Sequence, residues 1–113
     1  MKITEFNGSE NEIVEIFQVK TRLCLVIKRR LLDEIYHNGY VQTQKKHYGI
    51  DYEKFINRVD TDELTFSDYI GDEYFFGFDS AHAWNDHEPI SKTQKFVKNK
   101  TKELALEMIK RGI

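Results

Sequence analysis

The hydrophobic pattern along the chain consists mainly of short apolar runs, which predict strands rather than long helices. Between Tyr74 and Phe78, four of the five residues are aromatic, so a strand there would be apolar on both faces. Such a strand has to be covered on both sides. Five segments carry the apolar, β-branched or aromatic residues that are typical of strands: Glu12–Val19, Leu23–Lys28, Tyr40–Thr43, Glu63–Phe66 and Tyr74–Phe78.

Helical periodicity is clearest near the C-terminus. Ser91 is the expected N-cap of a helix that runs to about Arg111 and stops at Gly112. Its apolar stripe consists of Val97, Thr101, Leu104, Ala105 and Met108. A shorter amphipathic helix is predicted over Tyr52–Val59, with Asp51 as its cap, and Leu31–Tyr36 also has helical spacing, ended by His37-Asn38-Gly39.

These elements predict one α+β domain spanning residues 1–113. We expect a mainly antiparallel sheet of four or five short strands, with the C-terminal helix packed on one face. In addition, Asp68–Asp72, with Gly71, is predicted to form the turn that leads into the aromatic strand.

Composition adds a prediction about location. The only cysteine, Cys24, lies in an apolar run, which predicts a buried thiol and a reducing compartment. No signal-peptide pattern and no apolar run of membrane-spanning length is present, so no membrane association is expected. Together these features predict a cytoplasmic protein.

Charge is distributed unevenly although the net charge is only −2. The segment 59–91 contains no Lys or Arg but nine acidic residues, whereas 92–111 contains seven basic residues and two acidic ones. Either the two segments neutralise each other or are simply solvated, or the acidic segment recognises a basic partner. The second hypothesis assigns partner binding to seven residues: Asp60, Asp62, Glu63, Asp68, Asp72, Glu73 and Trp84.

The loop after the aromatic strand contains the residues best suited to chemistry: Asp79, His82 and Asp86, with His87 beside them. Carboxylates and an imidazole can bind a divalent metal or transfer protons. They can equally satisfy backbone N–H groups in a turn, or contact a ligand without catalysis. No HxH, HExxH or paired CxxC motif accompanies them. No resident cofactor is therefore assigned, and a divalent metal stays an alternative.

Aromatic residues outside the expected core strand raise a further alternative, a pocket that stacks a planar ligand such as a nucleotide. The candidates for its lining are Tyr40, Tyr48, Tyr52, Tyr69, Tyr74 and Trp84. Direct nucleic-acid binding is not expected, because the chain has a slight net negative charge and no recognisable nucleic-acid-binding motif.

Four segments of the chain form a combined pattern: Gly39-Tyr40-Val41, Tyr48-Gly49-Ile50-Asp51-Tyr52, Leu64-Thr65-Phe66, and Gly77-Phe78-Asp79-Ser80-Ala81-His82-Ala83 with Asp86. Together they resemble a family of small proteins encoded by phages and mobile elements of Gram-positive bacteria. The resemblance spans residues 39 to 111, and its most specific part is GFDxAH. Where the family has His-Gly-Gly, this chain has Thr61-Asp62-Glu63, and Trp84-Asn85-Asp86 replaces the family's Gly-Asp.

The resemblance implies an accessory protein and no established reaction. Of the family's two histidine motifs, this chain has only the one that contains His82. The resemblance therefore favours binding over catalysis. The leading hypothesis is a non-enzymatic inhibitor of bacterial defence, of the anti-CRISPR type, whose acidic face binds a host defence protein such as a CRISPR effector. The alternatives are a protein that sequesters a nucleotide signal near Trp84 and His82, and a metal-dependent hydrolase using Asp79, His82 and Asp86.

Overall fold

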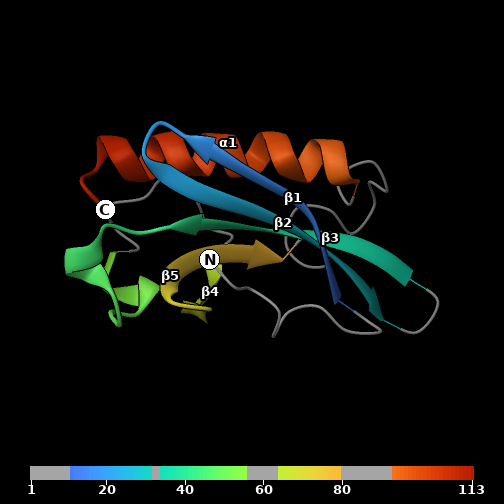
Figure 1. The fold of residues 1–113 in the computed structure, drawn as a ribbon, viewed down its shortest axis with the longest axis horizontal. Helices are drawn as coiled ribbons and strands as arrows, with labels where there is room; N and C mark the ends of the chain where they lie inside the picture. The colour runs from blue at the N-terminus through green and yellow to red at the C-terminus, as the bar shows by residue number, and fades with distance from the viewer. Residues whose placement is uncertain (1–10, 32–33, 56–63, 80–92) are drawn as a thin grey trace.

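A five-stranded antiparallel sheet with one C-terminal α-helix on one face forms the fold, as the sequence predicts (Figure 1). The computed structural model describes residues 11–31, 34–55, 64–79 and 93–113. The strands are β1 (Asn11–Val19), β2 (Arg22–Leu31), β3 (Glu34–Gln42), β4 (Leu64–Ile70) and β5 (Glu73–Asp79). Two short 3-10 helices, η2 (Lys45–His47) and η3 (Tyr52–Phe55), and the helix α1 (Gln94–Lys110) complete the fold.

The strands lie in the order β1-β2-β3-β5-β4, so β1 and β4 are the two edges of the sheet. Two-residue turns join β1 to β2 and β4 to β5, and each begins with a residue of positive φ: Lys20 at 55° and Gly71 at 66°. Positive φ is what tight hairpin turns require. β5 is inserted between β3 and β4, which buries the aromatic strand within the sheet.

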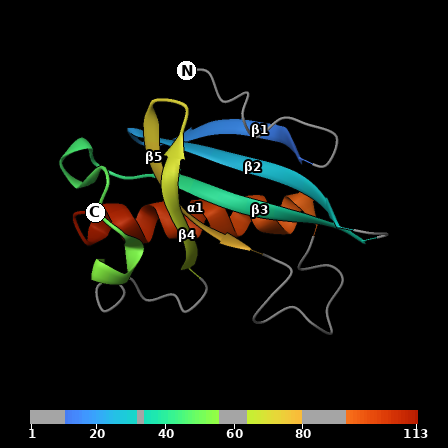
Figure 2. The same cartoon turned by 90° about the horizontal axis from the view of Figure 1, so that it is seen from below.

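The helix α1 lies across one face of the sheet, packed on β1, β2 and β3 (Figure 2). Its buried residues are the predicted ones: Val97, Thr101, Leu104, Ala105 and Met108. The helix begins at Gln94 and its N-cap is Thr93, which accepts a hydrogen bond from the Phe96 N–H, so the prediction of Ser91 as N-cap is wrong. Gly112 has φ 77°, which confirms it as the stop residue.

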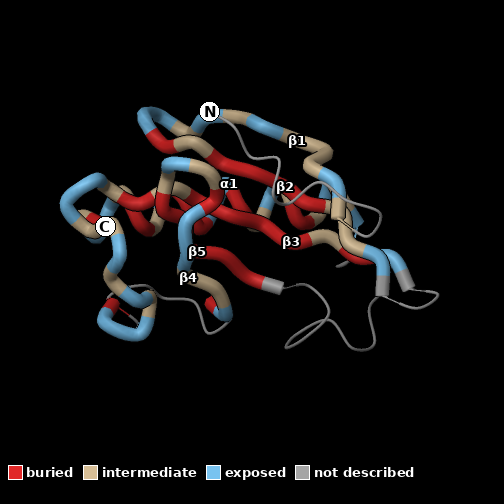
Figure 3. Tube along the Cα trace, turned by 60° about the horizontal axis from the view of Figure 1, so that its bottom comes forward, coloured by how far each residue is buried: buried red, intermediate tan, exposed pale blue. Residues whose placement is uncertain are grey.

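Both faces of β5 are covered, as its aromatic run predicts. Tyr74, Phe76 and Phe78 join the main core beneath α1, while Phe75 belongs to a second buried cluster with Leu25, Ile27, Tyr40 and Ile70. Figure 3 shows the buried residues concentrated in β2, β3 and β5, the three central strands. Cys24 is buried and forms no disulfide, which confirms the prediction of a buried thiol.

The helical interpretation of Leu31–Tyr36 is wrong. β2 ends at Leu31, β3 begins at Glu34, and these two residues are paired in the ladder. In the β3 part, side chains alternate between exposed Ile35 and buried Tyr36, which is the two-residue period of a strand. Asn38 and Gly39 continue β3 rather than ending an element.

Two other boundaries also differ from prediction. η3 covers only Tyr52–Phe55 of the predicted helix, and residues 56–59 lie outside the described residues. Asp51 caps η3 as expected, accepting a hydrogen bond from the Glu53 N–H at 2.9 Å. Asp68 lies within β4, so the turn comprises only Gly71 and Asp72.

Candidate functional site

The β4–β5 hairpin (64–79) carries acidic side chains at the edge of the sheet opposite β1. Asp68 and Asp72 are exposed and Glu73 is half-buried. No Lys or Arg occurs anywhere in the hairpin. None of these three carboxylates forms an ion pair with a described lysine or arginine. The hairpin therefore presents negative charge that the part of the chain described by the structure does not neutralise.

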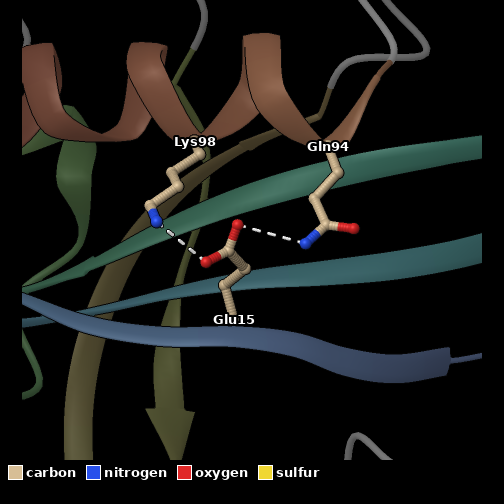
Figure 4. Close-up of polar contacts among 3 residues, drawn as sticks. All are labelled: Glu15, Gln94 and Lys98. Atoms are coloured by element: carbon tan, nitrogen blue, oxygen red, sulfur yellow. Dashed lines mark hydrogen bonds and ion pairs between the residues drawn. The ribbon is translucent and has the colours of Figure 1, made fainter.

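One lysine of α1 pairs with the edge strand β1 at the other side of the sheet. Lys98 Nζ lies 2.9 Å from Glu15 Oε1 of β1, and Gln94 Nε2 donates to Glu15 Oε2 at 3.1 Å (Figure 4). These contacts, the Lys98 hydrogen bond above all, lower the pKa of Glu15. Lys98, one of the basic residues of α1, is thus tied to the edge strand opposite the hairpin.

Two further ion pairs lie within the C-terminal segment itself. Lys100 Nζ is 3.9 Å from Glu103 Oε1, and Arg111 Nε is 2.8 Å from Glu107 Oε1. Both are helical pairs at i,i+3 and i,i+4 spacing, which contribute a few tenths of a kcal/mol each. Part of the positive charge of α1 is therefore compensated locally.

Glu73 is the centre of a hydrogen-bond network that joins three separate elements. Its Oε2 accepts hydrogen bonds from Gln42 Nε2 at 2.6 Å and from the Tyr48 hydroxyl. Gln42 Nε2 also lies 2.7 Å from the Tyr48 hydroxyl oxygen, and Gln42 Oε1 accepts from the Leu23 N–H at 3.1 Å. Arg22 Nη1 donates to the Gln42 carbonyl at 3.2 Å. β2, β3 and the chain after η2 are thereby fixed to the start of β5.

Three tyrosines pack together beside this network. The centroid of the Tyr69 ring lies 6.0 Å from that of Tyr48 and 4.9 Å from that of Tyr74, and both pairs have edge-to-face geometry. Tyr48 and Tyr74 are 6.2 Å apart. Burial, followed by the hydrogen bond to Glu73, raises the pKa of Tyr48. The outermost ring, Tyr69, is 47% exposed, so this cluster reaches from the core to the surface.

Asp68 is held next to Tyr69 by a local contact. Its Oδ1 accepts a hydrogen bond from the Tyr69 backbone N–H at 2.7 Å. Tyr69 pairs with Tyr74, whose carbonyl accepts a hydrogen bond from the Thr43 N–H on the other side of β5. Tyr69 and Tyr74 are therefore a non-hydrogen-bonded pair, and the Tyr69 N–H points away from β5. A carboxylate is consequently fixed at the outer edge of β4.

The structure brings together some of the predicted site residues. Asp68, Asp72 and Glu73 share the hairpin, and Tyr48, Tyr69 and Tyr74 form one cluster. Tyr40 and Tyr52 lie apart from it, against Phe66 and Phe76 respectively. Gln42 was not predicted, because no sequence signal marks a glutamine at the end of a strand as a partner for a residue 31 positions away.

The remaining predicted residues lie outside the described part of the chain or at its limit. Asp60, Asp62, Glu63, His82, Trp84 and Asp86 are not described, and Asp79 is described only as the last backbone position of β5. Among the described residues, no group of three or more His, Cys, Asp or Glu side chains could hold a metal ion. The metal and nucleotide hypotheses therefore gain no support from the described side chains.

Comparisons of the chain with protein-family models, curated proteins and solved structures find no match. Within the described residues, no helix has the length and apolar character needed to cross a membrane.

Proposed function

We propose that this protein is a non-enzymatic inhibitor that binds a basic surface of another protein through its β4–β5 hairpin. The observation that carries the proposal is that Asp68, Asp72 and Glu73 share one hairpin without a described cationic partner. Carboxylates without an ion-pair partner among the described residues attract a basic surface over a distance of about a Debye length, ~10 Å at moderate salt. Loss of water from such charges on binding is offset only when the partner supplies cations.

The class of partner follows from the resemblance of residues 39–111 to small phage and mobile-element proteins. Such accessory proteins meet bacterial defence systems, and CRISPR effectors hold nucleic acid in positively charged channels. We therefore propose a host defence protein with a basic channel as the partner, acting in the bacterial cytoplasm. The hairpin would occupy part of the channel and exclude nucleic acid from it.

A binding experiment with a matched charge control tests this function. Candidate effectors are immobilised, and binding is compared for the wild type, the Asp68→Lys/Asp72→Lys variant and the Glu12→Lys/Glu103→Lys variant. All four positions are exposed, and both variants change the net charge equally. We expect at least tenfold weaker binding only for the hairpin variant, and weaker wild-type binding at higher salt.

Equal loss of affinity in the two variants would show that overall charge, and not the hairpin, attracts the partner. Unchanged affinity in the hairpin variant would contradict the proposal directly. Circular dichroism and thermal melting of each variant establish that the fold is retained in all comparisons.

A further inference from the structure

β1 forms one edge of the sheet, and part of its backbone points away from β2 (Figure 2). Gln18 pairs with Leu23 of β2, and the Leu23 N–H donates to Gln42 Oε1 on the β3 side. Gln18 and Leu23 are therefore a non-hydrogen-bonded pair. Ile16 and Leu25 are another, because pairs of the two kinds alternate along an antiparallel ladder. The N–H and C=O groups of Ile16 and Gln18 consequently point outward from the sheet.

This outer edge is accessible. Ile16 is 59% exposed, more than any other large hydrophobic side chain among the described residues, and Gln18 is exposed as well. No backbone hydrogen bond joins the outward groups of Ile16 or Gln18 to another residue in the described part of the chain. The register is regular from Glu15 to Val19, since the β-bulge lies between Ile13 and Glu15. The edge from Glu15 to Val19 is therefore open to a further strand.

The same edge is complementary to a second copy of itself. Two antiparallel copies related by a two-fold axis at Phe17 place Ile16 of each copy opposite Gln18 of the other. Both residues carry outward-pointing backbone groups, so each of these pairs exchanges both of its N–H···O bonds. Phe17 then lies opposite Phe17 of the other copy in a non-hydrogen-bonded pair, where side chains approach most closely and aromatic pairs add stability.

Charge favours this antiparallel arrangement over a parallel one. Glu15 is bonded to Lys98 and Gln94, but its side chain keeps 24% exposure. In the antiparallel pair, Glu15 lies opposite Val19 of the other copy, and the exposed Lys20 follows directly after Val19. A cation of each copy thus comes near a carboxylate of the other, whereas parallel pairing in register would oppose like charges.

We propose that β1 is a self-association edge, at which two copies of the protein join their sheets. The joint leaves the β4–β5 hairpin of each copy at the far edge of the combined sheet, because β1 and β4 are opposite edges. The inference therefore goes beyond the proposed function and does not depend on it. A short pair of strands buries little surface, so the dimer is expected to be weak.

Sedimentation equilibrium over a series of protein concentrations tests the proposal. We expect dimers to form as the concentration is raised to about 1 mM, the dissociation constant of a very weak complex. Gln18→Pro should weaken dimerisation about tenfold or more, because each copy loses an outward N–H that makes no bond to β2. Gln18→Ala keeps this N–H and should dimerise like the wild type. Circular dichroism establishes that each variant is folded.

Ile16→Lys is a second test that leaves the backbone donors in place. A lysine in the middle of an edge strand is a common guard against pairing, so this variant should also weaken dimerisation. Leu106→Lys is its charge control, because Leu106 is 50% exposed and lies on α1, outside the edge. This control should dimerise like the wild type.

Cross-linking tests the register. Phe17→Cys should form a disulfide between copies under mild oxidation, because opposite residues of a non-hydrogen-bonded pair have Cα atoms about 4.5 Å apart. Gln18→Cys should cross-link much more slowly, since Gln18 of one copy lies opposite Ile16 of the other. Cys24 is buried and does not compete.

Three results would overturn the proposal. The first is a wild type that stays monomeric at about 1 mM, which would leave the edge to a strand of another protein. The second is an equal loss of dimerisation in Ile16→Lys and Leu106→Lys, and the third is equal cross-linking at positions 17 and 18. A monomeric wild type that binds an effector would overturn self-association alone and leave the proposed function standing.

Discussion

Gly39 of β3 lies directly against the Thr101 hydroxyl of α1. A β-carbon built on Gly39 would clash with Thr101 Oγ1 and would lie 2.7 Å from ring carbons of Phe78. The hydroxyl has no room to turn outward, since Thr101 is fully buried and donates to the Val97 carbonyl at 2.7 Å. The absence of a side chain at Gly39 therefore sets how closely the helix approaches the sheet.

Gly39→Ala should destabilise the fold by about 1–3 kcal/mol, the usual cost of overpacking a filled core. Chemical denaturation measures the loss as a change in the free energy of unfolding. The same substitution in a Thr101→Ala background should cost less, because one of the clashing groups is gone. Identical costs in the two backgrounds would show that the Gly39–Thr101 contact does not limit the packing.

Glu73→Gln should lower the pKa of Tyr48. Burial and the hydrogen bond to Glu73 both raise it, and the substitution removes the negative charge that opposes a phenolate. Ultraviolet titration should show one tyrosine ionising at lower pH than in the wild type, and this component should vanish in Tyr48→Phe. Exposed Glu53→Gln is the control and should leave the titration unchanged.

The Tyr48 shift also predicts how stability varies at high pH. The folded pKa lies above the unfolded value, so the contribution of Tyr48 is complete below a pH of about 10 and is lost as pH rises through the folded pKa. Tyr48→Phe should remove this part of the alkaline destabilisation. Denaturation curves at a series of alkaline pH values would contradict the assignment if the variant and wild type lose stability in parallel.

Lys98→Met should raise the pKa of Glu15 toward its ordinary value, since the Lys98 hydrogen bond is the largest cause of its lowering. In the wild type, the contribution of Glu15 is present above its unfolded pKa and is lost as pH falls through the lower folded pKa. The effect at neutral pH should stay below about 1 kcal/mol, as for a partly exposed pair. Lys110→Met, at an exposed position, should leave acid stability unchanged.

Cys24 should resist thiol reagents while the protein is folded. Burial raises the pKa of its thiol to about 12, and the side chain is fully enclosed. Stability should therefore be unaffected by this group below a pH of about 9, the ordinary pKa of the thiol, and should fall as pH rises toward 12. Rapid labelling at pH 8 without denaturant would contradict the buried position, and Cys24→Ala should lack the pH-dependent loss.

The parts of the fold that the sequence predicts are those with long or unambiguous patterns. The stripe from Val97 to Met108 extends over three helical turns, and only a helix fits it. The aromatic run Tyr74–Phe78 could only be a covered strand. Leu31–Tyr36 has helical spacing, but it includes the end of β2 and the start of β3. Its apolar residues therefore belong to two paired strands, which spacing along the sequence does not reveal.

The residues of the candidate site could be named from the sequence only where charge alone defines them. The lack of Lys and Arg from 59 to 91 is visible in the sequence and identifies Asp68, Asp72 and Glu73. Gln42 and Tyr48 can donate hydrogen bonds to Glu73 only because β5 lies beside β3, which is a consequence of strand order. No local pattern encodes that order, so the network could not have been found without the structure.

The bond between Asp68 and the Tyr69 N–H also limits how a partner can approach. An edge strand with open N–H groups invites another chain to extend the sheet, but here one such donor is already occupied and a negative charge stands beside it. Backbone-to-backbone strand addition at this point of β4 is consequently disfavoured, and under the proposed function recognition here would proceed through side chains. The same arrangement should discourage copies of the protein from joining edge to edge at β4.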